Sequence, residues 1–199
     1  VTPKSVDVEN SDMGPDFITP GAGPSVMVMS ASEVYFLRAE GALEGWAMQG
    51  TAQELYETGI TTSLSEYGYT VDLSGNDYVS STNTPASYDG TTPAVSTVPV
   101  AFDAGATAER QLEQIITQKW IAVYPNSMEA WTEMRRTGYP VLYPRLNSDN
   151  PNIAADEIPR RLTFPSSEYN TNGAEVQNAI GLLGGPDLGS TKLWWDKKN

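Results

Sequence analysis

Apolar residues recur at helical spacing in four stretches of the chain, and this pattern predicts four helices. The first two stretches are 30–46 and 51–68, and each opens with a Ser or Thr followed three residues later by Glu, the spacing of a capping box. The other two are 107–124 and 126–138. Short turns separate the members of each pair, so we expect two antiparallel helix hairpins.

The helical period stops between the hairpins, over residues 69–106, where Ser, Thr, Asn, Gly and Pro dominate. We expect an irregular insertion there, an extended lead-in over 1–29 and a loop-rich tail over 139–199. The predicted fold class is mainly α: helix hairpins of a tetratricopeptide-like type at 30–68 and 107–138, with a long irregular insertion and a loop-rich carboxy-terminal region. We treat residues 1–199 as one domain, the carboxy-terminal fragment of a larger protein.

The first hairpin has the size pattern of a tetratricopeptide-type repeat. Ala39 and Gly41 are small enough for close helix approach, while Leu43 and Tyr56 are large enough to fill the groove between helices. An ordinary amphipathic helix pair within a larger α-domain explains the spacing equally well.

Composition removes several function classes. The chain has no cysteine and no histidine, so it has no disulfide, no thiolate metal site and no cysteine or histidine for catalysis. A net charge of −13 repels phosphate backbones, and we predict no nucleic-acid partner. No apolar stretch approaches the roughly 20 residues of a membrane helix.

The acidic excess belongs to the first half of the chain. Residues 1–109 contain fifteen acidic side chains and two basic ones, Lys4 and Arg38, whereas 110–199 contain ten of each sign. Plain solvation is the favoured interpretation of this acidic face. A neutral polar ligand, a cationic ligand and a hard metal ion are the alternatives.

Aromatic residues lie among small polar residues in the insertion, a combination typical of sugar-binding surfaces. An aromatic face stacks on a sugar ring while neighbouring polar groups hydrogen-bond the hydroxyls. The candidate ligand-binding residues are Tyr78, Asn83, Tyr88 and Asp89. In the alternative interpretation, the tyrosines only pin a surface excursion to the core.

The last predicted helix contains two pairs at contact spacing. Trp131 and Arg135 are four residues apart and are expected to stack, and Glu133 and Arg136 are three apart and are expected to pair. We interpret these pairs as structural supports for the loop that follows.

An ordered series of motifs in the second half resembles the SusD/RagB-like outer-membrane nutrient-binding proteins. The series comprises Gln-Lys-Trp-Ile-Ala at 118–122, Glu-Ala-Trp at 129–131, Arg-Arg-Thr-Gly-Tyr-Pro at 135–140, Arg-Arg-Leu at 160–162 and Trp-Trp-Asp at 194–196. Phe164-Pro165 stands where the family has Tyr-Pro, and Glu168 and Asn170 follow. Residues of roughly 26–68 look like the family's preceding hairpin, whereas we recognise no family motif in 69–109.

The resemblance implies a non-catalytic protein that captures oligosaccharide or polysaccharide at the cell surface. It also implies a SusC-like TonB-dependent transporter as partner, and a lipid anchor on the outer membrane that lies outside this chain. The matched side chains most simply build the scaffold. They are Trp120, Glu129, Trp131, Arg135, Arg136, Arg160 and Arg161.

Three alternatives stay open. The chain could be a structural or protein-interaction module that docks the transporter. A glycoside hydrolase would need a carboxylate pair, for which Asp72, Asp77 and Asp89 are candidates. Asp72, Asn76 and Asp77 offer oxygen ligands for Ca²⁺, but they lack EF-hand spacing, so calcium is unsupported and no metal or cofactor is predicted.

Overall fold

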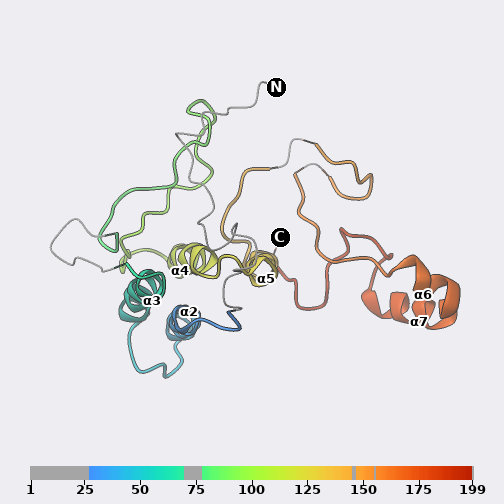
Figure 1. Cartoon of the computed structure of the whole chain (residues 1–199), viewed down its shortest axis with the longest axis horizontal. Helices are drawn as coiled ribbons and strands as arrows, with labels where there is room; N and C mark the ends of the chain where they lie inside the picture. The colour runs from blue at the N-terminus through green and yellow to red at the C-terminus, as the bar shows by residue number, and fades with distance from the viewer. Residues whose placement is uncertain (1–26, 70–77, 145–146, 155, 199) are drawn as a thin grey trace, which may run out of the picture. The chain divides into compact units, whose positions relative to one another are not determined.

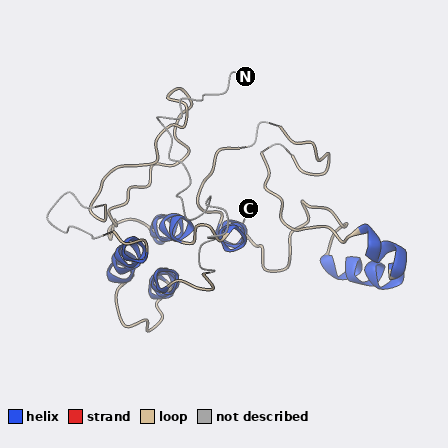
Figure 2. Ribbon diagram, in the orientation of Figure 1, coloured by secondary structure: helices blue, strands red, loops and turns tan. Residues whose placement is uncertain are grey.

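All regular secondary structure in the described part of the chain is helical, which confirms the predicted fold class (Figure 2). The computed structural model describes residues 27–69, 78–144, 147–154 and 156–198. The chain divides into two compact units, Val1–Ala101 and Phe102–Asn199. The helices are α2 (Ala31–Leu43) and α3 (Ala52–Glu66) in the first unit, and α4 (Ala108–Ala122), α5 (Ser127–Thr137), α6 (Ser166–Thr171) and α7 (Gly173–Leu183) in the second (Figure 1). That residues 1–199 form one domain stays a prediction.

Side-chain caps join the start of α2 to the end of α3, opposite the turn that connects the two helices. The Ser30 hydroxyl accepts a hydrogen bond from the backbone amide of Glu33 at 3.1 Å, as the capping signature predicts. Glu66, the last residue of α3, accepts from the backbone amide of Ala31 at 2.8 Å and from the Ser32 hydroxyl at 2.7 Å. A carboxylate is stabilised at a helix N-terminus, so Glu66 ties the end of α3 to the start of α2.

The turn between α2 and α3 is also fixed. Thr51 and Glu54 form the predicted capping box, in which each side chain accepts from the other residue's backbone amide. Before it, the Arg38 guanidinium donates to the carbonyl of Met48 at 2.6 Å and to that of Gln49 at 3.3 Å. Gln49 has a φ of 57°, a left-handed conformation unusual for a residue with a side chain. The Arg38 bonds therefore hold a turn that the backbone alone disfavours.

The interface between α2 and α3 is built on aromatic rings and a glycine. Phe36 and Tyr56 are fully buried and meet edge to face, with ring centroids 6.2 Å apart. Gly59 lies against Phe36, because a Cβ atom there would stand 2.9 Å from the Phe36 ring. Gly59 is thus a small residue that permits close approach of the two helices, and the sequence analysis did not name it. Ala39 is fully buried, as expected, whereas Gly41 lies against the side chain of Met48.

Replacing Gly59 by alanine is expected to lower the free energy of unfolding by about 1–3 kcal/mol, because the new methyl group overlaps the Phe36 ring. Gly181 in α7 is the matched control, since nothing lies within 4 Å of the position that a methyl group would take there. Gly181→Ala should leave stability unchanged or raise it by up to about 1 kcal/mol. Urea unfolding followed by far-ultraviolet circular dichroism measures both effects. Equal effects of the two substitutions would contradict close packing at Gly59.

The described part of the insertion has neither helix nor strand, but its ends are anchored. The Tyr56 hydroxyl donates to the backbone carbonyl of Val100 at 2.5 Å, and Val98 and Val100 are buried. The backbone amide of Ala101 donates to the carbonyl of Ser81 at 2.8 Å. The segment between Ser81 and Ala101 therefore begins and ends at one hydrogen bond within the first unit. We call residues 78–101 the excursion.

The second hairpin confirms the prediction from spacing. Thr107 and Asn126 cap α4 and α5 through their side chains, and Gly138 ends α5 with a φ of 80°. Ile115 and Ile116 on α4 are fully buried. The two helices contact each other within the second unit.

The loop-rich tail contains two short helices that the sequence analysis did not predict. α6 and α7 contact each other, and Figure 1 shows them side by side. α6 has only six residues, and Val176 is the only residue of α7 that is fully buried. Six residues are too few for α6 to show a helical period, whereas Val176, Ile180 and Leu183 of α7 do have helical spacing, which the sequence analysis did not use.

Candidate functional site

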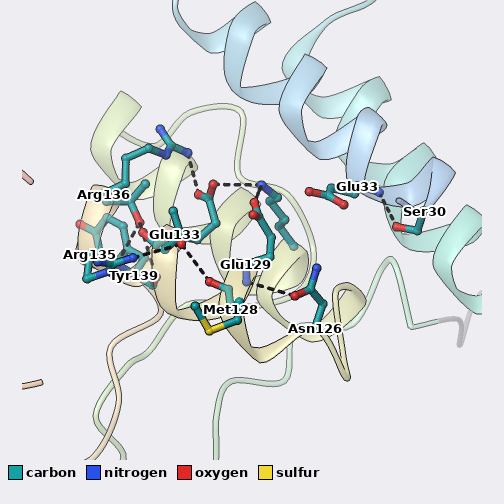
Figure 3. Close-up of polar contacts among 12 residues, drawn as sticks. Ser30, Glu33, Asn126, Met128, Glu129, Glu133, Arg135, Arg136 and Tyr139 are labelled. Atoms are coloured by element: carbon teal, nitrogen blue, oxygen red, sulfur yellow. Dashed lines mark hydrogen bonds and ion pairs between the residues drawn. The ribbon is translucent and has the colours of Figure 1, made fainter. Parts of the chain in front are cut away.

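A buried lysine joins the two helices of the second hairpin. The side chain of Lys119 on α4 is 1% exposed, and its Nζ lies 2.9 Å from a carboxylate oxygen of Glu129 and 2.9 Å from one of Glu133. The other Glu133 oxygen pairs with Arg136 at 2.6 Å, as predicted from their spacing (Figure 3). Burial disfavours the charged amine, but attraction to Glu133 and hydrogen bonds to both carboxylates outweigh it and raise the pKa of Lys119. The cluster therefore holds α5 against α4.

Arg135 forms the centre of a second cluster. Its guanidinium lies 3.6 Å from the centroid of the Trp131 ring, which confirms the predicted stack, and 4.8 Å from that of Trp195. Its Nη1 also donates to the backbone carbonyl of Arg160 at 2.6 Å. Arg160 in turn pairs with the buried carboxylate of Asp196 at 3.3 Å. Three distant parts of the sequence meet at this guanidinium.

Arg161 leads to a third cluster, which connects α6 to other parts of the tail. Its guanidinium pairs with Asp187, and both side chains are buried. The same carboxylate accepts from the backbone amide of Phe164 at 3.2 Å and from the Tyr169 hydroxyl of α6 at 2.6 Å. Burial acts to raise the pKa of Asp187, but the hydrogen bonds from Tyr169 and Arg161 outweigh it, so the pKa is lowered. This carboxylate fixes α6 to the segment before it.

These three clusters include all of the predicted scaffold residues except Trp120, which lies half-buried on α4. Their charged groups bind one another, backbone carbonyls or aromatic rings within the second unit. Such contacts favour a structural role for these residues. That role stays a prediction. The candidate ligand-binding residues lie elsewhere, in the excursion.

Asp89 organises the tip of the excursion. One carboxylate oxygen accepts from the backbone amides of Thr92 at 2.7 Å and Thr91 at 2.8 Å, and from the Ser87 hydroxyl at 3.1 Å. The other oxygen accepts from the Thr92 hydroxyl at 2.7 Å. These bonds, led by the Thr92 amide, hold the pKa of Asp89 far below its usual range. Asp89 is therefore ionised at neutral pH and cannot donate a proton there as a general acid.

The other three candidates expose their side chains to solvent. Tyr78 is 42% exposed and Tyr88 is 61% exposed. Asn83 is exposed, and its backbone amide donates to the Ser81 hydroxyl at 3.2 Å. The excursion thus carries two phenol rings, an amide and a tight turn. Its ends are fixed by the hydrogen bonds of Ser81 with Ala101 and of Tyr56 with Val100. An excursion of this kind can present rings and hydroxyl partners to a sugar.

Comparison with protein families gives a match over almost the whole chain. Residues 17–196 match the SusD-like model, described as SusD and RagB outer membrane lipoproteins. The chain belongs to the SusD-like family. The motif series that runs from Gln118 to Asp196 lies within the matched range.

Solved structures of SusD homologues are similar to the SusD-like chain. A chitin-binding SusD homologue from Flavobacterium johnsoniae is 45% identical with a TM-score of 0.79, and the match covers 86% of this chain and 37% of that one. A SusD homologue from Bacteroides ovatus is 42% identical with a TM-score of 0.79, over 87% and 38% of the two chains. One from Bacteroides thetaiotaomicron is 41% identical with a TM-score of 0.79, over 86% and 38%. The chain thus spans less than two-fifths of these homologues. A comparison with curated proteins found no match.

The described residues of the SusD-like chain give no support to a metal site. Among them, no three acidic side chains gather closely enough to hold an ion. The residues considered for calcium, Asp72, Asn76 and Asp77, lie outside the described residues, so the calcium alternative and their part in a carboxylate pair stay untested. Within the described ranges, no helix has the length and apolar character to cross a membrane.

Several residues of the SusD-like chain that hold the clusters were missed as contacts by the sequence analysis. Trp195 and Asp196 were noted only as a motif, and Asp187 and Tyr169 were not singled out. Asp187 is 26 residues from Arg161, and no local spacing indicates that pair. Trp194, in the same motif as Trp195, is 83% exposed, whereas Trp195 is half-buried against Arg135.

Proposed function

We propose that the SusD-like chain binds oligosaccharide or polysaccharide at the cell surface without cleaving it. The observation that carries the proposal is the 45% identity to a chitin-binding SusD homologue over 86% of this chain. The excursion adds local support, because it presents exposed tyrosines and an amide on an anchored base.

The proposal includes uptake of the bound glycan through a SusC-like TonB-dependent transporter. It also includes placement on the outer membrane by a lipid anchor outside this chain. The description of the family as outer membrane lipoproteins supports the anchor, and the resemblance to SusD/RagB-like proteins implies the transporter. Binding without catalysis is supported by the state of Asp89, whose lowered pKa removes one candidate proton donor for glycoside hydrolysis.

The test is calorimetric titration of the chain with neutral oligosaccharides derived from chitin, cellulose, starch and xylan. Saturable heat with every sugar recovered intact supports the proposal. Cleaved products after prolonged incubation would replace it with a hydrolase. Absence of binding across the panel would remove glycan recognition from this chain.

The double substitution Tyr78→Ala and Tyr88→Ala is expected to weaken glycan binding at least tenfold. Each ring contributes about 0.5–1.5 kcal/mol of stacking beyond the area that it covers. Trp194→Ala is the matched control. Trp194 is the most exposed aromatic residue that the structure describes, and it belongs to the second unit. A folded double variant with unchanged affinity would place the site outside the excursion. Circular dichroism of each variant confirms that it is folded.

A further inference from the structure

We propose that the excursion selects uncharged glycans and rejects glycans that carry carboxylate or sulfate groups. This inference rests on the proposed function and specifies its ligand class. It rests on the charged side chains of the first unit and on the hydrogen bonds that these side chains already make.

The described residues of the first unit offer no unoccupied basic side chain to an anionic sugar. The sequence has no Lys or Arg from 39 to 109. Arg38 is the only basic residue between 27 and 101, and its guanidinium is bonded to the carbonyls of Met48 and Gln49 and lies 5.4 Å from the centroid of the Tyr35 ring. Carboxylate and sulfate groups are recognised in proteins chiefly through charge-assisted hydrogen bonds from Arg and Lys. The first unit has no free group of this kind among its described residues.

The one charge within the excursion has the wrong sign for an anion. Asp89 is the only charged residue from 78 to 101. Its carboxylate faces its own turn, where the amides of Thr91 and Thr92 and two hydroxyls bind it. It therefore organises the backbone while adding a negative potential at the tip. An anionic sugar placed there would lose water without gaining a counter-charge.

The groups that stay exposed suit neutral sugars. Tyr78 and Tyr88 provide ring faces, and Asn83 provides an amide donor and acceptor. Ser and Thr hydroxyls surround them in the sequence, and both types donate and accept. Sugar hydroxyl and acetamido groups also donate and accept without charge. The excursion is thus matched to a neutral ligand in polarity.

The experiment compares neutral and charged forms of two hexasaccharides. The first pair is cellohexaose and its form oxidised to carboxylate at C6. The second pair is the N-acetylglucosamine hexamer and its 6-O-sulfated form, with the 6-O-methyl form as an uncharged control of added bulk. Each is titrated into the chain at about 20 mM and about 500 mM salt, because screening separates charge effects from contact effects.

We expect at least one neutral hexamer to bind, with less than a twofold change between the two salts. The unmodified form of that hexamer should bind at least tenfold more tightly than its charged form at low salt. For the N-acetylglucosamine hexamer, the 6-O-methyl form should also bind at least tenfold more tightly than the sulfated form. A charged form that binds as tightly as its neutral partner, or more tightly, overturns the inference while the proposed function stands. Failure of every form to bind is a different result, which overturns the proposed function and this inference with it.

A gain-of-charge variant tests the cause of the selectivity. Asn83→Lys places a cation on the excursion, and Asn83→Gln is the matched control that keeps an amide. Asn83→Lys should bind the carboxylate or sulfate hexamer at least fivefold more tightly at low salt than Asn83→Gln, and this gain should disappear at high salt. A folded Asn83→Lys protein that binds the neutral hexamer and still rejects the charged one equally well would show that charge is not the cause.

Discussion

Replacing Lys119 by methionine is expected to lower the free energy of unfolding by about 3–5 kcal/mol. Methionine retains much of the volume of the lysine stem but removes the amine that lies 2.9 Å from both Glu129 and Glu133. Among the described residues, Arg136 is then the one ion-pair partner left to the buried Glu133. The loss exceeds that of an exposed ion pair because a buried carboxylate has no water to replace its partner.

The matched control is Lys198→Met, which makes the same chemical change at an exposed pair. Lys198 pairs with Glu109, and both side chains are more than one-third exposed. We expect a loss of no more than about 1 kcal/mol there. Denaturant unfolding followed by tryptophan fluorescence suits both variants, because four of the five tryptophans belong to the second unit. Similar losses in the two variants would show that burial adds nothing to the Lys119 pairs.

The Lys119 cluster also predicts a pH dependence. The pKa of Lys119 is raised in the folded protein above its usual value of 10.5. Its contribution to stability is therefore fully present below about pH 10.4, the usual pKa of lysine in an unfolded chain, and is lost as pH rises through the folded pKa. The stability difference between the parent and Lys119→Met should accordingly shrink in alkaline solution. A difference that is constant or grows above pH 10.5 would contradict the raised pKa.

Replacing Arg135 by alanine is the second change with a large expected effect, a loss of about 2–4 kcal/mol. The guanidinium stacks between Trp131 and Trp195 and donates to the carbonyl of Arg160 at 2.6 Å. Alanine removes the stack and leaves that carbonyl without its charged donor.

Arg135→Lys is the informative partner variant, because it keeps the positive charge but loses the planar fork. We expect it to recover less than half of the loss, as measured by the same unfolding experiment. A lysine variant as stable as the parent would mean that charge alone holds the cluster. The environment of Trp131 and Trp195 gives a second readout, since their fluorescence should shift toward that of exposed indole in Arg135→Ala.

Local signals were sufficient to predict much of the helical fold. Ser30 with Glu33 and Thr51 with Glu54 mark helix starts within four residues, and both caps form as predicted. The Trp131–Arg135 stack was predictable for the same reason, because residues four apart on a helix share a face.

Contacts between distant residues were not predictable in this way. Glu66 reaches the start of α2 from 35 residues away, and Asp187 meets Arg161 across 26. A single sequence has no period or spacing that links such positions. The insertion shows the same limit, since its composition left open whether the tyrosines bind a ligand or pin the segment to the core, and it could not predict that Ser81 and Ala101 meet.

The hydrogen bond between Ser81 and Ala101 brings the two ends of the intervening loop together. Tyr56 holds the returning segment through the carbonyl of Val100, independently of what lies between. Lengthening a surface loop whose ends already touch adds little to its closure entropy. We therefore expect insertions and deletions between Ser81 and Ala101 to change the stability of the α2–α3 hairpin little.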